Sequence, residues 1–233
     1  MRREALVPRG KQSKGSCTYC GQEMAKGAVA KHLAACPKRR TVIDKAERKK
    51  VGSETLYHLR VQDAWHKQFW LDLEMRGSGT LNDLDFYLRG IWLECCGHLS
   101  QFSLEGWQGQ EIGKKRKVAE VFNPGIELTH IYDFGTSSET LITMVGTRAG
   151  KPTTARPIAL MARNIMPEAK CIECEQPAAW LCIECLTEEN VWGTLCDAHA
   201  EKHPHENYGE PIGLVNSPRL GMCGYGGPAE PPY

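Results

Sequence analysis

The sequence lacks any run of about 20 apolar residues, the length that a helix needs to span a bilayer. It also lacks an excess of one charge, because 29 Lys and Arg residues face 28 Asp and Glu residues. No strong overall field therefore steers the chain toward nucleic acid or an anionic membrane. The N-terminus has no apolar stretch after its first charges, as a signal peptide would have. These absences predict a cytoplasmic protein without a membrane partner.

Cysteine is what the chain has in quantity, with 11 residues among 233. Thiols stay reduced in the cytosol, so this number favours metal ligands over disulfides. The length suits one medium core with small satellites. Charge is distributed unevenly, since residues 1–50 are clearly basic. A basic arm of this kind can contact phosphate or acidic protein, or it can be a soluble tail, and both interpretations stay open.

The densest cysteine pattern is CIECEQPAAWLCIECLTEENVWGTLCDAHAEKHPH at residues 171–205. A C-x-x-C turn brings two sulfurs onto one side of a metal, and zinc takes four thiolate or imidazole ligands in a tetrahedron. Buried free thiols would not produce three ordered pairs. We therefore predict two zinc sites from eight candidate ligands: Cys171, Cys174, Cys182, Cys185, Cys196, His199, His203 and His205.

The order of these residues resembles a B-box zinc domain over about 35 residues. The resemblance implies that the pairs interleave. The first zinc would then take Cys171, Cys174, Cys196 and His199, and the second would take Cys182, Cys185, His203 and His205. His203 and His205 lie closer together than B-box histidines usually do. Residues two apart on an extended strand point the same way, so both can still reach one ion.

If all eight groups bind, neither ion keeps a position for water or substrate, and such a closed site is structural. The segment has few apolar residues for a core of its own: Trp180, Leu181, Val191, Trp192 and Leu195. Zinc would supply the missing folding free energy, on the order of 10 kcal/mol per structural site.

A second pattern, CTYCGQEMAKGAVAKHLAAC, places Cys17, Cys20, His32 and Cys36 at the spacing of a small finger. It resembles the ββα zinc-finger class, with Cys36 in place of the last histidine. His32 and Cys36 are four apart and share one helix face. The chain thus has ligands for up to three zinc ions. One finger makes too few contacts for sequence-specific DNA binding, so we favour a docking or structural finger, although its lysines and arginines (Lys26, Lys31, Lys38, Arg39 and Arg40) could hold phosphates.

Between the clusters the pattern predicts an α+β domain. Residues 55–63 alternate as a strand does, and 68–75 can pair with them. Thr80 and Asp83 form a capping-box pattern before a helix with one apolar face. We expect further strands at 98–106, 127–135 and 139–148. The predicted organisation is a disordered basic lead (1–16), a finger (17–37), a linker helix (38–52), the α+β domain (53–165), a two-zinc cross-brace domain (166–206) and a Gly/Pro-rich tail (207–233), which is unstructured or laid across another surface.

Three stretches of the central domain resemble a known family: TLNDLDFYLRGIW at 80–92, GHLSQF at 97–102 and HIYDFG at 130–135. The family is the open-reading-frame-three-like proteins of a root-inducing plasmid, whose members are also described as passenger proteins of insertion elements. The resemblance implies an α+β fold and an association with mobile elements, and no established reaction. Members usually continue with an acidic residue, a Trp and a His, where this chain has Thr136, Ser138 and Thr140.

Our leading hypothesis is a non-enzymatic zinc-binding modular protein. Its first partner class is protein, and its second is nucleic acid, bound through the basic N-terminus and the KKRK loop at 114–117. The alternative is a metal-dependent or acid/base enzyme that acts on nucleic acid in a mobile-element pathway. That alternative predicts a pocket around His98 and Asp133, with Glu139 nearby, or a zinc with an open position. A third option, a regulator, would need dimerisation. We interpret Cys95, Cys96 and Cys223 as small apolar fillers.

Overall fold

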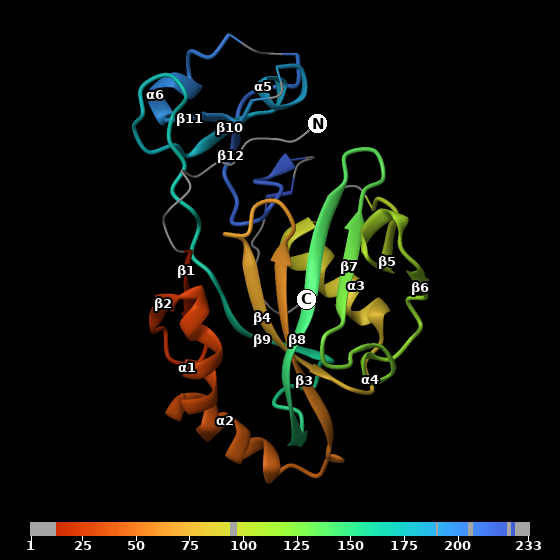
Figure 1. The fold of residues 1–233 in the computed structure, drawn as a ribbon. Helices are drawn as coiled ribbons and strands as arrows, with labels where there is room; N and C mark the ends of the chain where they lie inside the picture. Colours follow the sequence, from red (N-terminus) through yellow and green to blue (C-terminus); the bar gives the residue numbers. More distant parts are fainter. Residues whose placement is uncertain (1–12, 94–96, 190, 205–206, 223–224, 227–233) are drawn as a thin grey trace.

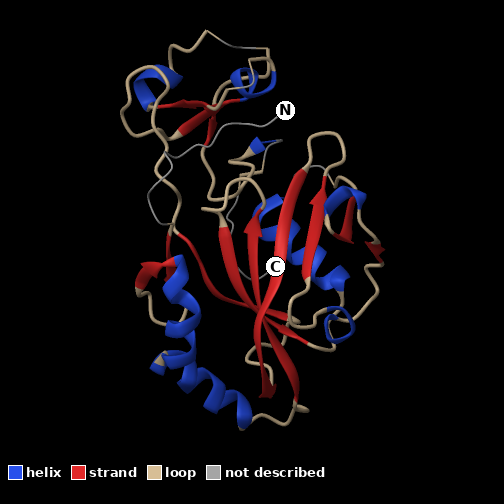
Figure 2. Ribbon diagram, viewed as in Figure 1, coloured by secondary structure: helices blue, strands red, loops and turns tan. Residues whose placement is uncertain are grey.

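The computed structural model describes residues 13–93, 97–189, 191–204, 207–222 and 225–226, and it confirms the α+β class. A nine-stranded antiparallel sheet has the order β2-β1-β9-β4-β3-β8-β7-β5-β6, and a three-stranded sheet has the order β11-β10-β12 (Figure 1). The small sheet with α5 and α6 lies beyond one end of the large sheet, and α1 and α2 run along its side (Figure 2). No helix in the described parts of the chain combines the length and apolar character that a membrane crossing requires.

The strands of the large sheet are β1 (Lys14–Cys17), β2 (Glu23–Ala25), β3 (Glu54–Asp63), β4 (Trp70–Arg76), β5 (Ser100–Leu104), β6 (Glu111–Ile112), β7 (Glu127–Tyr132), β8 (Ser138–Gly150) and β9 (Ile158–Asn164). Those of the small sheet are β10 (Trp180–Cys182), β11 (Gly193–Leu195) and β12 (Ile212–Gly213). The α-helices are α1 (Val29–Ala35), α2 (Pro37–Glu47), α3 (Leu81–Leu88), α4 (Val118–Val121), α5 (Ile183–Thr187) and α6 (Asp197–Ala200). Single turns are η1 (Lys26–Ala28), η3 (Gly106–Gln108) and the π-helical η2 (Arg89–Leu93).

Helix α3 covers one face of the large sheet and forms the main core with it. The predicted capping box is present, because Asp83 N–H donates to Thr80 Oγ1 and Thr80 N–H donates to Asp83 Oδ2. The helix buries its apolar face completely against side chains of β3, β4 and β5: Leu81, Leu84, Leu88, Leu59, Leu73 and Phe102. The π-helical turn η2 continues this face with Ile91 and Trp92.

The finger is continuous with the large sheet. Strand β1 pairs with β9, with Gly15 opposite Asn164 and Cys17 opposite Ala162. Gly15 leaves room for Trp70, since a Cβ at this position would lie 2.4 Å from the Trp70 ring. The disordered lead expected for 1–16 is therefore wrong for residues 14–16, which form a paired strand. The pairing partner β9 was also not predicted as a strand.

The described part of the tail packs on the body, which is the second of the two outcomes left open. Leu220, Met222 and Tyr225 are buried in the main core. The Tyr225 hydroxyl donates to the Gly90 carbonyl at 2.7 Å. Strand β12 adds to the small sheet by pairing with β10. Residues after 206 therefore tie the C-terminal unit to α3 and its π-helical turn.

Candidate metal centres

The N-terminal cluster brings together Cys17, Cys20, His32 and Cys36, whose ligand atoms all lie within 4.8 Å of one another. Tetrahedral zinc with sulfur at about 2.3 Å has edges of about 3.8 Å, so this spacing admits one ion. Cys17 ends β1, and the turn after it closes through Gly21 N–H, which donates to the Cys17 carbonyl at 2.8 Å. Cys36 lies between α1 and α2, with Pro37 at the first helical position.

Burial and backbone N–H groups act in opposite directions on the pKa values of two thiols of this cluster. It raises the pKa of Cys17 to about 11, and the backbone N–H groups of Tyr19 and Cys20 offset it only in part. For Cys36 burial acts in the same direction, but the N–H groups of Arg39 and Lys38 help to lower the pKa. A buried thiolate needs a positive charge beside it, and Zn²⁺ supplies such a charge.

A second cluster joins Cys171, Cys174, Cys196 and His199 within the same 4.8 Å limit. His199 Nδ1 lies 3.4 Å from Cys171 Sγ and 3.3 Å from Cys196 Sγ, and the Cys174 and Cys196 sulfurs are 3.7 Å apart. Burial opposes ionisation of Cys171, but the backbone N–H groups of Cys196, Glu173 and Cys174 bring its pKa down to about 6. The donor set is three sulfurs and one imidazole nitrogen.

A third cluster joins Cys182, Cys185 and His203. His203 Nε2 lies 3.2 Å from Cys185 Sγ. Burial, together with Cys182, raises the pKa of Cys185 to about 12. Gly193 lets β11 approach the Cys182–Cys185 segment closely, because a Cβ at position 193 would lie 2.5 Å from Cys185 Cβ. His205, the predicted fourth ligand, lies outside the described residues.

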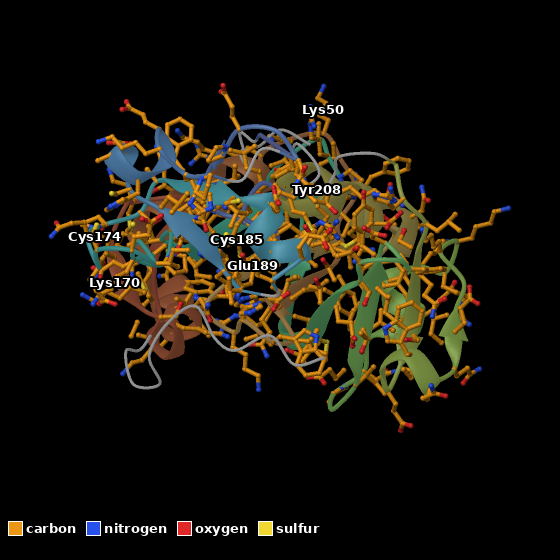
Figure 3. The ribbon with its side chains drawn as sticks, turned by 90° about the horizontal axis from the view of Figure 1, so that it is seen from above. Lys50, Lys170, Cys174, Cys185, Glu189 and Tyr208 are labelled. Atoms are coloured by element: carbon orange, nitrogen blue, oxygen red, sulfur yellow. The ribbon has the colours of Figure 1, made fainter. Side chains whose placement is uncertain are left out.

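The first and third Cys/His pairs of residues 171–199 share one cluster, and the middle pair joins His203 in another. This is the interleaved order that the B-box resemblance implied. Figure 3 labels Cys174 and Cys185, one from each cluster, and they lie well apart in the C-terminal unit. With the N-terminal cluster, three Cys/His clusters are consistent with up to three zinc ions.

Glu173 was missed by the sequence analysis. Its carboxylate lies between the two C-terminal clusters, with Oε1 3.2 Å from His203 Nδ1 and Oε2 3.7 Å from His199 Nε2. Each of these nitrogens belongs to the side of the imidazole ring that faces away from the sulfurs. A usable signal was present, because CIEC occurs twice, at 171–174 and 182–185. The C-x-x-C spacing specifies only the two cysteines and leaves the middle residues of both copies unspecified.

The polar groups of the enzyme alternative, His98, Asp133 and Glu139, contact other groups of the protein. His98 Nε2 lies 3.6 Å from Asp133 Oδ2, but Arg219 Nη2 donates to the same oxygen at 2.9 Å. Asp133 has a φ of 62° and accepts from the N–H groups of Gly135 and Thr136, as a turn residue does. Glu139 instead lies beside Trp107 and Asp63, and burial raises its pKa.

A buried polar cluster under α3 was also missed. Asp85 accepts from Ser100 Oγ at 2.7 Å, Lys114 Nζ at 2.9 Å and Arg89 Nε at 3.1 Å, and its Oδ1 lies 2.8 Å from His130 Nε2. Its position four residues after Leu81, on the apolar face, was the available signal. These donors hold the pKa of Asp85 well below its usual range although burial opposes them.

The Ser100 hydroxyl is held by three partners of this cluster. It donates to Asp85 and accepts from Lys114 Nζ at 2.6 Å and from Arg89 Nη2 at 2.7 Å. One hydrogen and two lone pairs are thereby used. The Asp85 carboxylate lies between Ser100 and His130 and contacts both. Lys114, in the KKRK loop, is therefore directed inward.

Comparison with known proteins gives a distant structural match and no family. No family model matches the chain, and no curated protein matches it. Among solved structures, the crystal structure of a protein of unknown function, MM3350 from Methanosarcina mazei Go1, is similar over 47% of this chain and 69% of that chain. The two share 18% sequence identity with a TM-score of 0.41, so this similarity assigns neither a family nor a function.

Proposed function

We propose that this protein is a non-enzymatic, zinc-stabilised scaffold whose two metal-held ends present surfaces to a macromolecular partner. The observation that carries the proposal is the composition of the clusters. Two of them draw four ligand atoms each from the protein within 4.8 Å, which fills a zinc tetrahedron without water or substrate. The third has three such atoms in the described residues, and His205 would complete it.

Local packing around the C-terminal ligands supports the same proposal. The buried cluster around the ligands consists of Cys171, Cys182, Cys185 and Leu195, with Cys174, Cys196 and Ala200 packed against it, whereas Leu181 and Leu186 of this unit pack into the main core. Such a cluster is far too small to hold a fold by burial alone. Metal binding would then contribute free energy to the folding of this unit rather than serve catalysis.

Another protein is the first partner class. Ile172, Val191 and Tyr208 of the C-terminal unit are 50%, 44% and 49% exposed. Apolar and aromatic side chains of this kind are what the core of a protein interface uses. The mobile-element association implied by the resemblance belongs to this proposal as well. Its motif residues form α3, β5 and the end of β7, which make the body that carries both metal-held ends.

Nucleic acid is the second partner class, and α2 favours it. Lys38, Lys45 and Arg48 are exposed and recur at helical spacing, so they share one face. The helix starts directly after the ligand Cys36, which would let zinc fix its position. Lys26 and Arg39, in contrast, turn inward, where Lys26 Nζ donates to Gln62 and Arg39 donates to Glu74 at 2.9 Å.

Native mass spectrometry of the full chain, purified without chelator, tests the scaffold. We expect three zinc ions per chain, and a Cys171→Ser variant that loses zinc together with C-terminal structure. A content below one ion per chain would overturn the proposal.

Binding to a generic duplex at increasing salt tests the second partner class. A triple variant (Lys38→Glu, Lys45→Glu, Arg48→Glu) should weaken binding, and the control Arg156→Glu, an exposed residue outside the N-terminus and the 114–117 loop, should not. No binding at low salt would remove nucleic acid as a partner.

A further inference from the structure

One carboxylate lies between histidines of two metal clusters. Glu173 sits inside the first C-x-x-C turn, between Cys171 and Cys174. Its Oε1 is 3.2 Å from His203 Nδ1, and its Oε2 is 3.7 Å from His199 Nε2. His203 has a side-chain exposure of only 6%, so its outward nitrogen needs a partner from the protein. Glu173 is that partner.

The contacts also identify the nitrogen that each ring offers to a metal. His199 directs Nδ1 to the Cys171 and Cys196 sulfurs, whereas His203 directs Nε2 to the Cys185 sulfur. The remaining nitrogens, Nε2 of His199 and Nδ1 of His203, are those near Glu173. His199 therefore offers Nδ1 to a metal and His203 offers Nε2. The Glu173 carboxylate lies near the opposite nitrogen of each ring and so accounts for both orientations.

We infer that Glu173 is a shared positioning residue that orients His199 and His203 and thereby couples the two C-terminal zinc sites. A carboxylate that accepts the outer N–H of a metal-bound histidine fixes the orientation of the ring and raises its basicity, and loss of such a partner costs about 10–100-fold in metal affinity. Here one carboxylate serves two ions. Binding at one site holds Glu173 in place for the other, so the sites should fill as a pair.

The two distances predict unequal effects. The 3.2 Å separation from His203 is close to hydrogen-bond length, whereas 3.7 Å from His199 exceeds it. The site of Cys182, Cys185 and His203 should therefore depend on Glu173 more strongly than the site of Cys171, Cys174, Cys196 and His199. This inference rests on the proposed zinc scaffold.

Metal titrations of the full chain test the inference, with Zn²⁺ for affinity and Co²⁺ as a spectroscopic probe. A Cys17→Ser background removes the N-terminal site, which also has three thiolates. The remaining sites, with three and with two thiolates, give different cobalt absorption, so the two C-terminal sites can be followed separately. Glu173→Ala should weaken the His203 site about 10–100-fold, weaken the His199 site less, and abolish paired filling. Glu173→Gln keeps an oxygen acceptor and should restore part of the His203 affinity.

The matched control is Glu175→Ala. Glu175 lies two residues further on, is 80% exposed and pairs with Lys170 at 2.7 Å, so its removal should change neither affinity. Long-range proton–nitrogen NMR of the zinc-loaded chain identifies the protonated nitrogen of each ring, and the Nδ1–H of His203 should exchange with solvent faster in Glu173→Ala than in the wild type or in Glu175→Ala. The wild-type spectrum should show a protonated Nε2 on His199 and a protonated Nδ1 on His203.

Wild-type affinities at both sites in Glu173→Ala would overturn the inference and leave the scaffold standing, provided that the wild type holds three zinc ions. A His203 that binds metal through Nδ1 would overturn it as well. A wild type without C-terminal zinc would overturn the scaffold itself, and this inference with it.

Discussion

The two ends of the molecule hold the same kind of donor set in different surroundings. At the N-terminal end, Cys17 and Cys36 share a buried cluster with Val29, Leu33 and residues of the large sheet, Trp70 and Met161. At the C-terminal end, the cluster around the ligands consists almost entirely of ligands. The first end is therefore supported by a sheet as well as by its metal, and the second depends on metal for its interior.

Backbone pairing also indicates that the N-terminal end depends less on its metal than the C-terminal end does. The finger adds β1 to β9, and the Thr18 hydroxyl donates to the Leu160 carbonyl at 2.8 Å. The C-terminal unit is attached mainly by side chains, with Leu181 and Leu186 in the main core and Trp192 edge-on to His66 at 5.3 Å. Equal ligand chemistry thus does not mean equal dependence on zinc.

The largest expected effect is that of Cys171→Ser, or of a chelator, on the C-terminal unit. Loss of a structural zinc removes on the order of 10 kcal/mol from a unit whose ligand cluster has almost no other buried residues. Hydrogen exchange by mass spectrometry should show near-complete loss of protection at 171–204, with β3, β4 and β8 unchanged. Retained protection in that segment would mean that the unit does not need its metal, and the contrast between the ends would fail.

Asp85→Ala should give the next largest loss of stability. The loss should be confined to the large sheet and leave both metal-held ends unchanged. The substitution leaves His130, Arg89 and Lys114 without their shared carboxylate, at a cost of about 3–5 kcal/mol. Urea unfolding should show this loss in the large sheet, while native mass spectrometry still counts three zinc ions. A loss of zinc in this variant would show that the body and the ends are not separable.

The same residue predicts a pH dependence. The pKa of Asp85 is lower in the folded state than in the unfolded state, so the unfolded chain binds more protons in the window between the two values. Its stabilisation is present above about pH 4 and is lost as the pH falls below that value. The wild type should lose stability on acidification more steeply than Asp85→Ala. Parallel curves for the two proteins would contradict the assignment.

Cys17→Ser should have the smallest effect of these changes. One zinc is lost, but β1 keeps its pairing with β9 and its contact with Trp70. We expect amide protection of residues 15–17 to fall by roughly 100-fold or less, which corresponds to local rather than global opening. Complete loss of protection in this strand would show that the finger needs its metal as much as the C-terminal unit does.

The sequence predicted what depends on short-range spacing. The C-x-x-C pairs, the Thr80–Asp83 cap and the α+β class follow from patterns within a few residues. The pairing of β1 with β9 joins residues about 150 positions apart, and no local pattern specifies such a partner. The roles of Glu173 and Asp85 could not be predicted from the sequence, because each occupies a position that its own motif leaves unspecified. Only the fold brings their partners together.

The most direct test of the central claim is a zinc-edge anomalous diffraction map of crystals of the full chain. Our account predicts three zinc ions, each with four protein ligands at about 2.0–2.3 Å and no bound water. A water or other free oxygen ligand on either C-terminal ion, with one of the cysteines or histidines turned away, would contradict it and favour a hydrolytic site.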